Sequence, residues 1–481
     1  HYTDREKIMM IVKPVIIDPL ERKWSAAKAN IAAALAKADA AKGAGRTKAL
    51  AEAARVMTDW RERLLRFRVL DPACGSGNFL YLALLSLKDI EHRANLEAEQ
   101  MGLPREFPRV GPENVLGLEL NPYAAELARV SVWIGEIQWM RRNGFDAARN
   151  PILRTLSNIE CRDSVLATDQ YGQPLLDAGG KPQRATWPEA DVVVGNPPFL
   201  GNKKMIAELG EAYTRALRKA WPQVPSGADL VCYWFAAAWD MMVGGKLERS
   251  GLVTTNSIRG GANREVLKAI VANGRIFTAW SDEDWTVEGA AVRVSMICFD
   301  READTDVMLD GKTVPGIGPD LTSGLTISSA KRLPQNAGRS FVGIQKTGKF
   351  NIPGDLARQM LTAPINPNGR PNGDVLKPYW NGIDLTRRPQ DIWLIDFPLE
   401  FSASTASLFE MPYAYLEQTV KPERAPNKIE WLRDNWWLLW RARPDMRAAV
   451  EGFDRFIVTP EVSKHRLFVW MPKPRLPDKN L

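Results

Sequence analysis

The sequence predicts an α/β fold in which a parallel sheet is covered by helices on both faces. Strand patterns alternate with helix patterns from residue 67 to about residue 260, and the strands end in Gly, Asp or Asn. A glycine-rich turn, DPACGSG, joins the first strand to the helix that follows it. Strands that alternate with helices form parallel sheets. Ligands of such sheets bind at the carboxyl ends of the strands, where the polar residues gather here.

A helical segment, residues 1–66, precedes the sheet. Residues 1–20 carry apolar residues at helical spacing, and Thr3 or Asp4 can cap that helix. Residues 24–66 are rich in Ala and in charged residues and are broken once, at KGAGR. This pattern predicts two helices that form a hairpin.

The elements of the sheet follow the same alternation. In chain order they are the strand FRVL, the helix NFLYLALLSLKDIEHRANLEAEQ, the strand NVLGLEL, the helix NPYAAELARVSVWIGEIQWM, the strands NIECRDSVL and ADVVVGNPP, a helix at 229–242 and the strand SGLVTTNSI. The longest apolar run, LVCYWFAAAWDMMV, has 14 residues. Because a membrane span needs about 20 apolar residues, this run predicts a buried helix, and no membrane association is expected.

The alternation of strands and helices ends near residue 300. Pro, Gly and Asn cluster at 311–325 and 350–375, which predicts a domain boundary within 305–345. We therefore expect a sheet domain at 67–310 and a second domain at 311–481. With 481 residues the chain is too long for one ordinary core, which agrees with more than one domain.

Charge and cysteine usage narrow the class of protein. The formal net charge is +7, which is compatible with a polyanionic partner. The four cysteines lie far apart and only three histidines occur, so no metal site is expected. The cysteines are expected to be reduced, as in a cytosolic protein. The chain begins at His1 rather than Met, which suggests a fragment of a longer protein.

Acidic residues at the ends of successive strands point to a nucleoside-type cofactor. Gly75 and Gly77 allow the backbone to approach a ligand closely. Glu119 ends the next strand and can bind the two hydroxyls of a ribose, while Asp163 can accept from the amino group of an adenine ring. The turn is not a Walker loop, since no Gly-Lys-Ser/Thr follows. It is also a poor dinucleotide fingerprint, because Leu80 replaces the third glycine of GxGxxG.

The stretch DVVVGNPPFLG, residues 191–201, suits chemistry on an exocyclic amino group. Such a group on adenine or cytosine is a poor nucleophile because its lone pair is delocalised into the ring. The side-chain oxygen of Asn196 and the carbonyl oxygen of Pro197 can accept its hydrogens and localise that lone pair. Pro197 and Pro198 fix φ and carry no N–H, so the turn presents carbonyls rigidly. Phe199 offers a face on which a flipped-out base can stack.

Three motifs together carry a resemblance to a known family. DPACGSGNFL, the acidic Glu119 and GNPPF resemble the motifs of class I S-adenosylmethionine-dependent DNA amino-methyltransferases. HYT at the start of the chain resembles the cofactor-capping motif of that family. The order of cap, glycine loop, NPPF and recognition domain resembles that of the gamma class. More narrowly, VGNPPFLGNKKM, VTTNSI, EGAAVRVSMICF and KPYWNGIDLTRRP are similar to the MmeI-like, type IIL restriction–modification enzymes and their relatives in phage defence.

The resemblance implies a Rossmann-like class I methyltransferase sheet, S-adenosyl-L-methionine as the cofactor, and an incomplete target-recognition, DNA-binding domain at 311–481. It implies adenine N6 as the target, because N4-cytosine enzymes more often carry Ser-Pro-Pro. The residues expected to bind the cofactor are Tyr2, Thr3, Asp71, Ala73, Gly75, Gly77, Asn78, Phe79, Glu119, Leu120, Asp163, Ser164 and Asn196. The residues expected to be catalytic are Asn196, Pro197, Pro198 and Phe199, with no metal ligand among them.

The expected function is site-specific methylation of adenine N6 in double-stranded DNA, for restriction–modification or phage defence in the cytoplasm of a bacterium. Further subunits or domains of such a system are expected partners, and the chain itself shows no nuclease motif. Two alternatives stay open: an RNA (guanine N2) or protein-glutamine methyltransferase that uses the same turn, and a catalytically silent DNA-binding subunit. The lack of a Pro-Cys dipeptide argues against a C5-cytosine methyltransferase. Asn256, in VTTNSI, either lines the same cleft or caps a helix.

Overall fold

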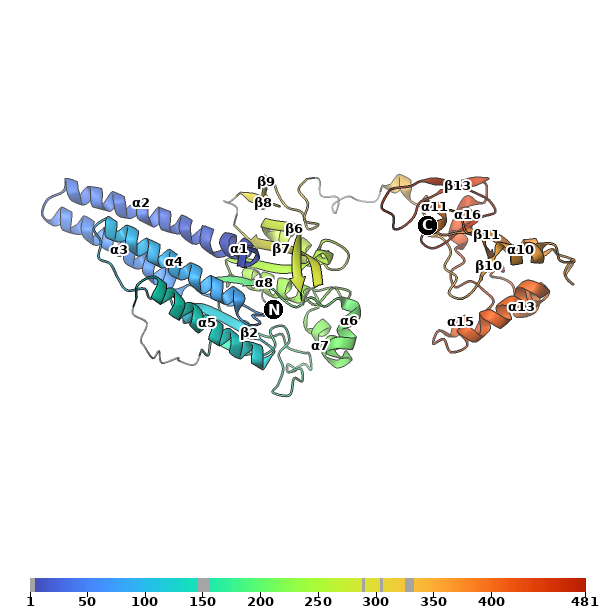
Figure 1. The fold of residues 1–481 in the computed structure, drawn as a ribbon, viewed down its shortest axis with the longest axis horizontal. Helices are drawn as coiled ribbons and strands as arrows, with labels where there is room; N and C mark the ends of the chain where they lie inside the picture. The colour runs from blue at the N-terminus through green and yellow to red at the C-terminus, as the bar shows by residue number, and fades with distance from the viewer. Residues whose placement is uncertain (1–4, 146–155, 288–289, 303–305, 325–332) are drawn as a thin grey trace. The chain divides into compact units, whose positions relative to one another are not determined.

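The chain folds into two compact units, residues 1–330 and 331–481, which are described separately (Figure 1). The computed structural model describes residues 5–145, 156–287, 290–302, 306–324 and 333–481. Tyr2 and Thr3, which form part of the expected cofactor cap, lie outside the described residues.

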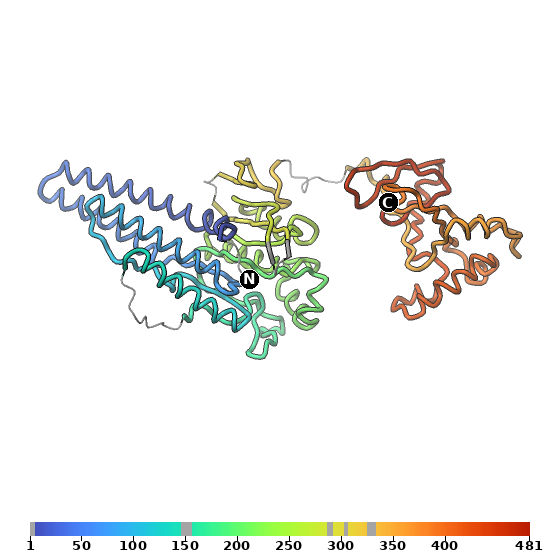
Figure 2. Tube along the Cα trace, in the orientation of Figure 1, coloured from blue at the N-terminus to red at the C-terminus, as the bar shows by residue number. Residues whose placement is uncertain are grey.

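The first unit opens with a long helical hairpin. α1 (Arg5–Val12) continues through a π-helical turn, Lys13–Ile17, into α2 (Asp18–Ala40), and α3 (Ala44–Arg66) returns alongside α2 (Figures 1 and 2). Gly43, in the connecting turn, has φ 57°, a backbone conformation that favours glycine. The expected hairpin and its break at KGAGR are confirmed.

A nine-stranded sheet forms the centre of the first unit, in the order β3-β2-β1-β4-β5-β7-β6-β8-β9. Its strands are β1 (Val69–Asp71), β2 (Val115–Glu119), β3 (Ile159–Cys161), β4 (Val192–Gly195), β5 (Arg249–Thr255), β6 (Arg275–Val287), β7 (Ala290–Asp300), β8 (Val307–Leu309) and β9 (Lys312–Val314). The first five strands in this order are parallel, and β7 is antiparallel to both β5 and β6. The expected Rossmann-like, mostly parallel sheet is confirmed. Because β9 ends at Val314, the sheet continues past the boundary expected at residue 310.

Helices cover both faces of this sheet. Besides α1 to α3 they are α4 (Asn78–Gln100), α5 (Pro122–Arg142), α6 (Asn202–Leu209), α7 (Glu211–Ala220), α8 (Cys232–Val243) and α9 (Arg264–Asn273), with 3₁₀ turns at Pro112–Asn114 and Asn256–Arg259. α1 to α5 pack on one face, and α6 to α9 pack on the other. The apolar run LVCYWFAAAWDMMV contributes α8, which is buried as expected. Within the described part of the chain, no helix combines the length and apolarity that crossing a membrane requires.

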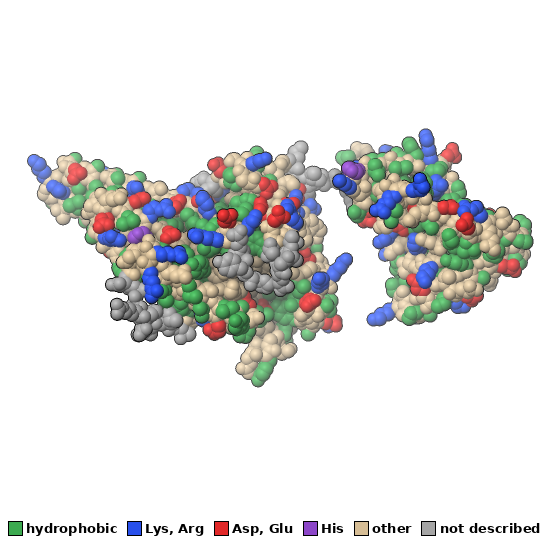
Figure 3. All heavy atoms as spheres, in the orientation of Figure 1, with side chains coloured by type: hydrophobic (Ala, Val, Ile, Leu, Met, Phe, Trp, Pro, Cys, Tyr) green, Lys and Arg blue, Asp and Glu red, His purple; other side chains and the backbone are tan. Residues whose placement is uncertain are grey.

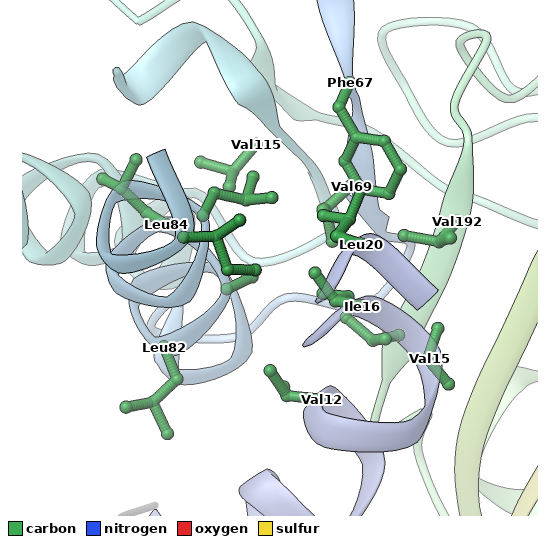
Figure 4. Packing of buried hydrophobic residues seen from close by; sticks show 14 of the residues in the cluster. Val12, Val15, Ile16, Leu20, Phe67, Val69, Leu82, Leu84, Val115 and Val192 are labelled. Atoms are coloured by element: carbon green, nitrogen blue, oxygen red, sulfur yellow. The ribbon is translucent and has the colours of Figure 1, made fainter. Parts of the chain in front are cut away.

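Successive strand residues point into opposite cores, as strand geometry requires. Val192 and Val194 of β4 belong to the core with α1 to α5, whereas Val193 between them belongs to the core with α6 to α9. Figure 4 shows Val69 of the sheet close to Leu20, and Val192 on the side of Val15; Leu20 and Val15 both come from the N-terminal helical segment. Full burial of such a side chain stabilises the fold by roughly 1.5–3 kcal/mol. The helical segment is therefore an integral part of the sheet domain.

The second unit has a sheet and a core of its own. Its strands are β10 (Asn351–Pro353), β11 (Leu376–Trp380), β12 (Ile392–Ile395) and β15 (Leu476–Pro477), in the order β10-β12-β11-β15, and a separate ribbon of β13 (Arg455–Val458) and β14 (Val469–Pro472). Its helices are α10 (Gly354–Leu361), α11 (Gly382–Thr386), α12 (Ala403–Ser407), α13 (Glu410–Thr419), α14 (Lys421–Arg424), α15 (Glu430–Asp434) and α16 (Pro444–Val450). On the face drawn in Figure 3, basic and acidic side chains are interspersed over each unit.

Candidate active site

A cavity of about 720 Å³ lies at the carboxyl ends of β1 to β4. It is lined by Pro72, Ala73, Leu118, Glu119, Leu120, Asn121, Arg162, Asp163, Ser164, Asn196, Pro198, Leu200, Glu208, Leu209, Tyr213, Leu230 and Trp234. The residues that the sequence singled out among them are Ala73, Glu119, Leu120, Asp163, Ser164, Asn196 and Pro198. They meet because β1 pairs in parallel with β2 and β4, and β2 with β3, so that these strands end at one edge of the sheet.

The glycine turn after β1 is joined to the acidic residue that ends β2. Gly75, with φ 53°, donates its backbone N–H to Glu119 Oε2 at 2.8 Å. The other carboxylate oxygen, Oε1, accepts from the backbone N–H of Asn121 at 2.8 Å. Because each carboxylate oxygen has about two lone-pair directions, both retain the capacity to accept from a ligand. Backbone donors therefore orient a negative group in the wall of the cavity.

The second glycine of the turn allows α4 to lie close to α5. Gly77 precedes α4 with φ 85°, and a Cβ there would lie 2.9 Å from the Cα of Ala128 in α5. No real side chain fits at that distance. Leu80, at the position of the third glycine in a dinucleotide fingerprint, is instead a buried core residue. The glycines of the turn thus allow its positive φ angles and the close packing of α4 against α5.

Asp163, which follows β3, has hydrogen-bond partners on both carboxylate oxygens. Oδ1 accepts from the backbone N–H groups of Val165 at 2.8 Å and Leu166 at 3.0 Å. Oδ2 accepts from the hydroxyl of Tyr213 in α7 at 2.6 Å. The carboxylate is therefore fixed in position, with its Oδ2 on the side of Tyr213, and both residues line the cavity.

Asn196 follows β4 and presents an unsatisfied acceptor. Its Oδ1 is buried and accepts no hydrogen bond from any described residue. A buried acceptor without a donor costs about 1–3 kcal/mol, and such groups are few in folded proteins. Since Asn196 lines the cavity together with Pro198, a donor on a ligand is the natural partner for this oxygen.

The backbone after the NPPF turn is fixed by the loop that leads into α8. The N–H of Leu230 donates to the carbonyl of Leu200 at 2.9 Å, and the N–H of Asn202 donates to Asp229 Oδ1 at 2.9 Å. Asp229 Oδ2 in turn accepts from the side-chain amide of Asn263 at 2.7 Å. Asp229 therefore connects the segment after the turn to the start of α9.

Asp71 lies beneath the cavity rather than in its wall. It is 1% exposed, and its Oδ1 accepts from the N–H of Ala73 at 3.1 Å. Burial raises the pKa of Asp71 to about 8; the hydrogen bond from Ala73 opposes this rise and the nearby charge of Glu119 adds to it. A Cβ at Gly195 would lie 2.5 Å from Asp71 Oδ1, so the residue before Asn196 has to be glycine.

The other described residues expected at the site do not line the cavity. They are Asp71, Gly75, Gly77, Asn78, Phe79, Pro197 and Phe199. Phe79 is 3% exposed and belongs to the core between the sheet and α1 to α5, and Phe199 packs partly buried against the same core. Asn256 does not line the cavity either, because its Nδ2 donates to Asp282 and its Oδ1 accepts from Ser295.

Sequence reasoning missed the wall that α6 to α8 contribute. Leu209, Tyr213 and Trp234 belong to this wall, and Trp234 Nε1 also donates to the carbonyl of Pro72 at 3.1 Å. An apolar or aromatic residue on an amphipathic helix has the same sequence pattern whether it faces a core or a cavity. No sequence signal could have distinguished these residues from ordinary core positions.

Residues 47–310 match the model of the family described as the DNA-methyltransferase domain of MmeI. The match covers more than half of the chain. The chain belongs to this family. The resemblance to MmeI-like enzymes, expected from the motifs, is confirmed.

MmeI itself offers a structural comparison. A solved structure of this type IIL restriction–modification enzyme in complex with DNA superposes with a TM-score of 0.65 and 18% sequence identity. The alignment covers 100% of this chain and 62% of the MmeI chain. At this identity the likeness is one of fold.

Two further relatives are similar in sequence. DNA methyltransferase A of Bacillus subtilis (strain 168) is 26% identical over 353 residues, which cover 69% of this chain and 35% of that protein. A putative type II restriction enzyme and methyltransferase of Methanocaldococcus jannaschii is 27% identical over 118 residues, which cover 24% of this chain and 10% of that protein. The chain thus spans less than two thirds of the length of MmeI and of each of these two relatives.

Proposed function

We propose that the chain is a site-specific DNA methyltransferase that transfers a methyl group from S-adenosyl-L-methionine to N6 of an adenine flipped out of double-stranded DNA. Membership of the family of MmeI DNA-methyltransferase domains supports methyl transfer to DNA. The NPPF turn supports an exocyclic amino group as the acceptor. We further propose that the protein serves restriction–modification or phage defence in the bacterial cytoplasm, where further domains or subunits would supply other activities.

The cavity fits the proposed cofactor in size and in donor and acceptor chemistry. Glu119 and Asp163 would accept from the ribose hydroxyls and from the adenine amino group, respectively, and leucine side chains with Trp234 would enclose the adenine ring. The glycine turn at 75–77 would let backbone approach the rest of the molecule. When bound, the cofactor supplies an electrophilic methyl group on a sulfonium.

The observation that carries the proposal is the buried Oδ1 of Asn196, which has no hydrogen-bond partner among the residues that the structure describes and lies in the same cavity as Glu119 and Asp163. This oxygen would accept one hydrogen of the target amino group, and the carbonyl of Pro197 would accept the other. Each hydrogen bond directs electron density back to the nitrogen, so the lone pair becomes available for attack. The transfer would form a bond from N6 to the methyl carbon and break the bond from that carbon to sulfur, so S-adenosylhomocysteine would leave and one amino proton would pass to water. Orientation and electrostatic stabilisation would promote this step without a covalent intermediate on the protein.

The target base has to leave the duplex to reach this position, which costs a few kcal/mol. Phe199, next to the turn, would compensate part of that cost by stacking on the extruded base. The second unit, residues 331–481, would act as the beginning of a target-recognition domain that holds the DNA backbone and reads base edges.

In the deciding experiment, the protein is incubated with S-adenosyl-L-methionine that is tritiated in the methyl group. Three separate reactions each contain one substrate: DNA, RNA or protein extract. We expect label in DNA alone, and N6-methyladenine at a defined sequence when that DNA is sequenced for modified bases. Label in RNA or at protein glutamine would support the corresponding alternative enzyme. DNA binding without label in any substrate would support a silent DNA-binding subunit, and N4-methylcytosine would correct the target base.

A further inference from the structure

The cavity wall beside Asp163 contains a tyrosine that no motif predicts. Tyr213 lies in the first turn of α7, lines the cavity, and donates its hydroxyl to Asp163 Oδ2 at 2.6 Å. Burial, together with the charge of Asp163, raises the pKa of Tyr213 above its ordinary value. The phenol therefore keeps its proton, and that proton is held between the two residues.

The hydrogen bonds of Asp163 use the phenol proton of Tyr213. Oδ1 accepts from the backbone N–H groups of Val165 and Leu166, and Oδ2 accepts from the hydroxyl of Tyr213. Because its only proton is used, the phenol oxygen can act toward the cavity only as an acceptor. Asp163 Oδ2 and Tyr213 Oη thus form a pair of adjacent acceptors.

The guanidinium of Arg162, the cation in this part of the wall, is already engaged. Its Nε donates to Glu160 at 2.6 Å, its Nη1 donates to the backbone carbonyl of Asp163 at 3.5 Å, and its Nη2 donates to the carbonyl of Thr186 at 2.8 Å. Each of its three nitrogens therefore already has an acceptor on the protein. Apolar side chains line the same cavity: Leu118, Leu120, Leu209, Leu230 and Trp234. Such a lining suits the faces of a flat heteroaromatic ring.

We propose that Tyr213 and Asp163 together select a 6-aminopurine cofactor over the corresponding 6-oxopurine, with Tyr213 as the residue that determines this specificity. The inference rests on the proposed function, because it takes the cavity as the site of S-adenosyl-L-methionine. An exocyclic amino group can direct a hydrogen at the two oxygens, which lie 2.6 Å apart and can share it. A 6-oxo group would instead bring a third acceptor against them and would offer no hydrogen. Sites with committed hydrogen-bond partners reject such analogues strongly.

Isothermal titration calorimetry with S-adenosylhomocysteine and its 6-oxo analogue, S-inosylhomocysteine, tests the proposal without any need for turnover. We expect the wild-type chain to bind the adenosyl compound at least about 100-fold more tightly than the inosyl compound, since unpaired buried acceptors cost about 1–3 kcal/mol each. Tyr213→Phe should weaken binding of the adenosyl compound about tenfold and leave binding of the inosyl compound unchanged or improved. The ratio of the two affinities should therefore fall about tenfold or more.

Two further variants make the test independent of the stability of Tyr213→Phe. In Asp163→Asn the oxygen should stay with the backbone N–H groups of Val165 and Leu166, so an NH₂ donor would replace Oδ2. We expect this variant to lose or reverse the preference for the amino compound. Tyr233→Phe removes a hydroxyl from a buried tyrosine of α8 that does not line the cavity, and it should keep the wild-type ratio.

Two results would overturn the proposal and leave Tyr213 a purely structural role. One is an equal loss of affinity for both compounds in Tyr213→Phe. The other is an unchanged ratio of the two affinities in Asp163→Asn. A wild-type chain that binds neither compound would have a different meaning: the cofactor assignment of the proposed function would fail, and this inference with it. Tight binding of both compounds by the wild-type chain would refute the selectivity alone.

Discussion

The backbone amide of Gly75 donates a 2.8 Å hydrogen bond to the carboxylate of Glu119, and this bond joins the turn after β1 to the end of β2. The N–H of Asn121 holds the other carboxylate oxygen. The acidic side chain is thus oriented before any ligand binds. A side chain that is already ordered loses little rotamer entropy when it accepts from a pair of vicinal hydroxyls.

Glu119→Gln is expected to weaken the binding of S-adenosylhomocysteine by about 10- to 100-fold, as a hydrogen bond to a charged group contributes about 1.5–3 kcal/mol. The amide NH₂ would face either the N–H of Gly75 or that of Asn121. Because both groups are hydrogen-bond donors, that hydrogen bond would be lost. Titration calorimetry measures the effect. Glu126→Gln, at an exposed side chain of α5, is the matched control and should bind normally. Equal affinities of Glu119→Gln and the wild type would contradict this role.

Asn196→Ala is expected to lower the rate of methyl transfer by about 100-fold or more. The affinity for S-adenosylhomocysteine should change only a few-fold. Removing one preorganised group that acts on developing charge typically costs about 10²–10³ in rate. The reason is that Oδ1, which has no partner among the described residues, would contact the target base rather than the cofactor. Single-turnover transfer of tritiated methyl groups and calorimetry separate the two effects. A parallel loss of cofactor affinity would show that the role assigned to Asn196 is wrong.

Asp163→Ala is expected to show the reverse order of effects. The carboxylate fixes both the loop at Val165 and Leu166 and the hydroxyl of Tyr213, and it would accept from the adenine amino group. Its loss should raise the dissociation constant of S-adenosylhomocysteine by about tenfold or more. At saturating cofactor the rate of transfer should recover toward the wild-type value. An unchanged dissociation constant would refute the assignment.

The sequence predicted those parts of the site that depend on strand ends. Glu119 ends a strand of the parallel part of the sheet, and Asp163 and Asn196 each follow one. Because parallel strands end at one edge, their meeting follows from topology alone. For Gly75 and Gly77 the sequence predicted close approach of a ligand, and the structure shows that both also adopt positive φ.

The parts that depend on side-chain packing could not be predicted. Phe79 is next to the glycine turn in the sequence, yet helical geometry turns its ring into the core, where it is 3% exposed. Tyr213 is 50 residues from Asp163, and only the placement of α6 and α7 over the sheet brings them together. Asn256 resembled a cleft residue by its position after β5, but the side chains of Asp282 and Ser295 bind it.

Asp71→Asn is expected to make the stability of the chain less dependent on pH. Because burial raises the pKa of Asp71 to about 8, the folded state keeps a proton that the unfolded state releases near its ordinary pKa of 3.8. The wild-type free energy of unfolding should therefore fall between about pH 4 and pH 8 and become level above that. The asparagine, which keeps the acceptor for the N–H of Ala73, should lack this fall.

Urea unfolding from pH 5 to pH 9 measures the difference between the two proteins. The advantage of Asp71→Asn should grow with pH and reach a few kcal/mol, since one pKa unit corresponds to about 1.4 kcal/mol. Parallel stability curves for the variant and the wild type would mean that Asp71 is ionised in the folded state.

Gly77→Ala is expected to lower the free energy of unfolding by about 2–5 kcal/mol, through two separate costs. The left-handed conformation, φ 85°, costs a residue with a Cβ about 1–2 kcal/mol. The new methyl group would also lie 2.9 Å from the Cα of Ala128, so α4 and α5 would have to separate, which adds about 1–3 kcal/mol. The shift of α4 would carry the glycine turn with it, and cofactor binding should weaken as well.

Gly102 provides the matched control, because it follows the other end of α4 with φ 86° and has open space where its Cβ would be. Gly102→Ala should therefore show the conformational cost alone, about 1–2 kcal/mol, with normal binding of S-adenosylhomocysteine. Chemical denaturation and calorimetry on both variants separate the contact with Ala128 from backbone strain. If the two variants lost equal stability, the close approach of α4 to α5 would contribute nothing, and the second glycine of the turn would be explained by its conformation alone.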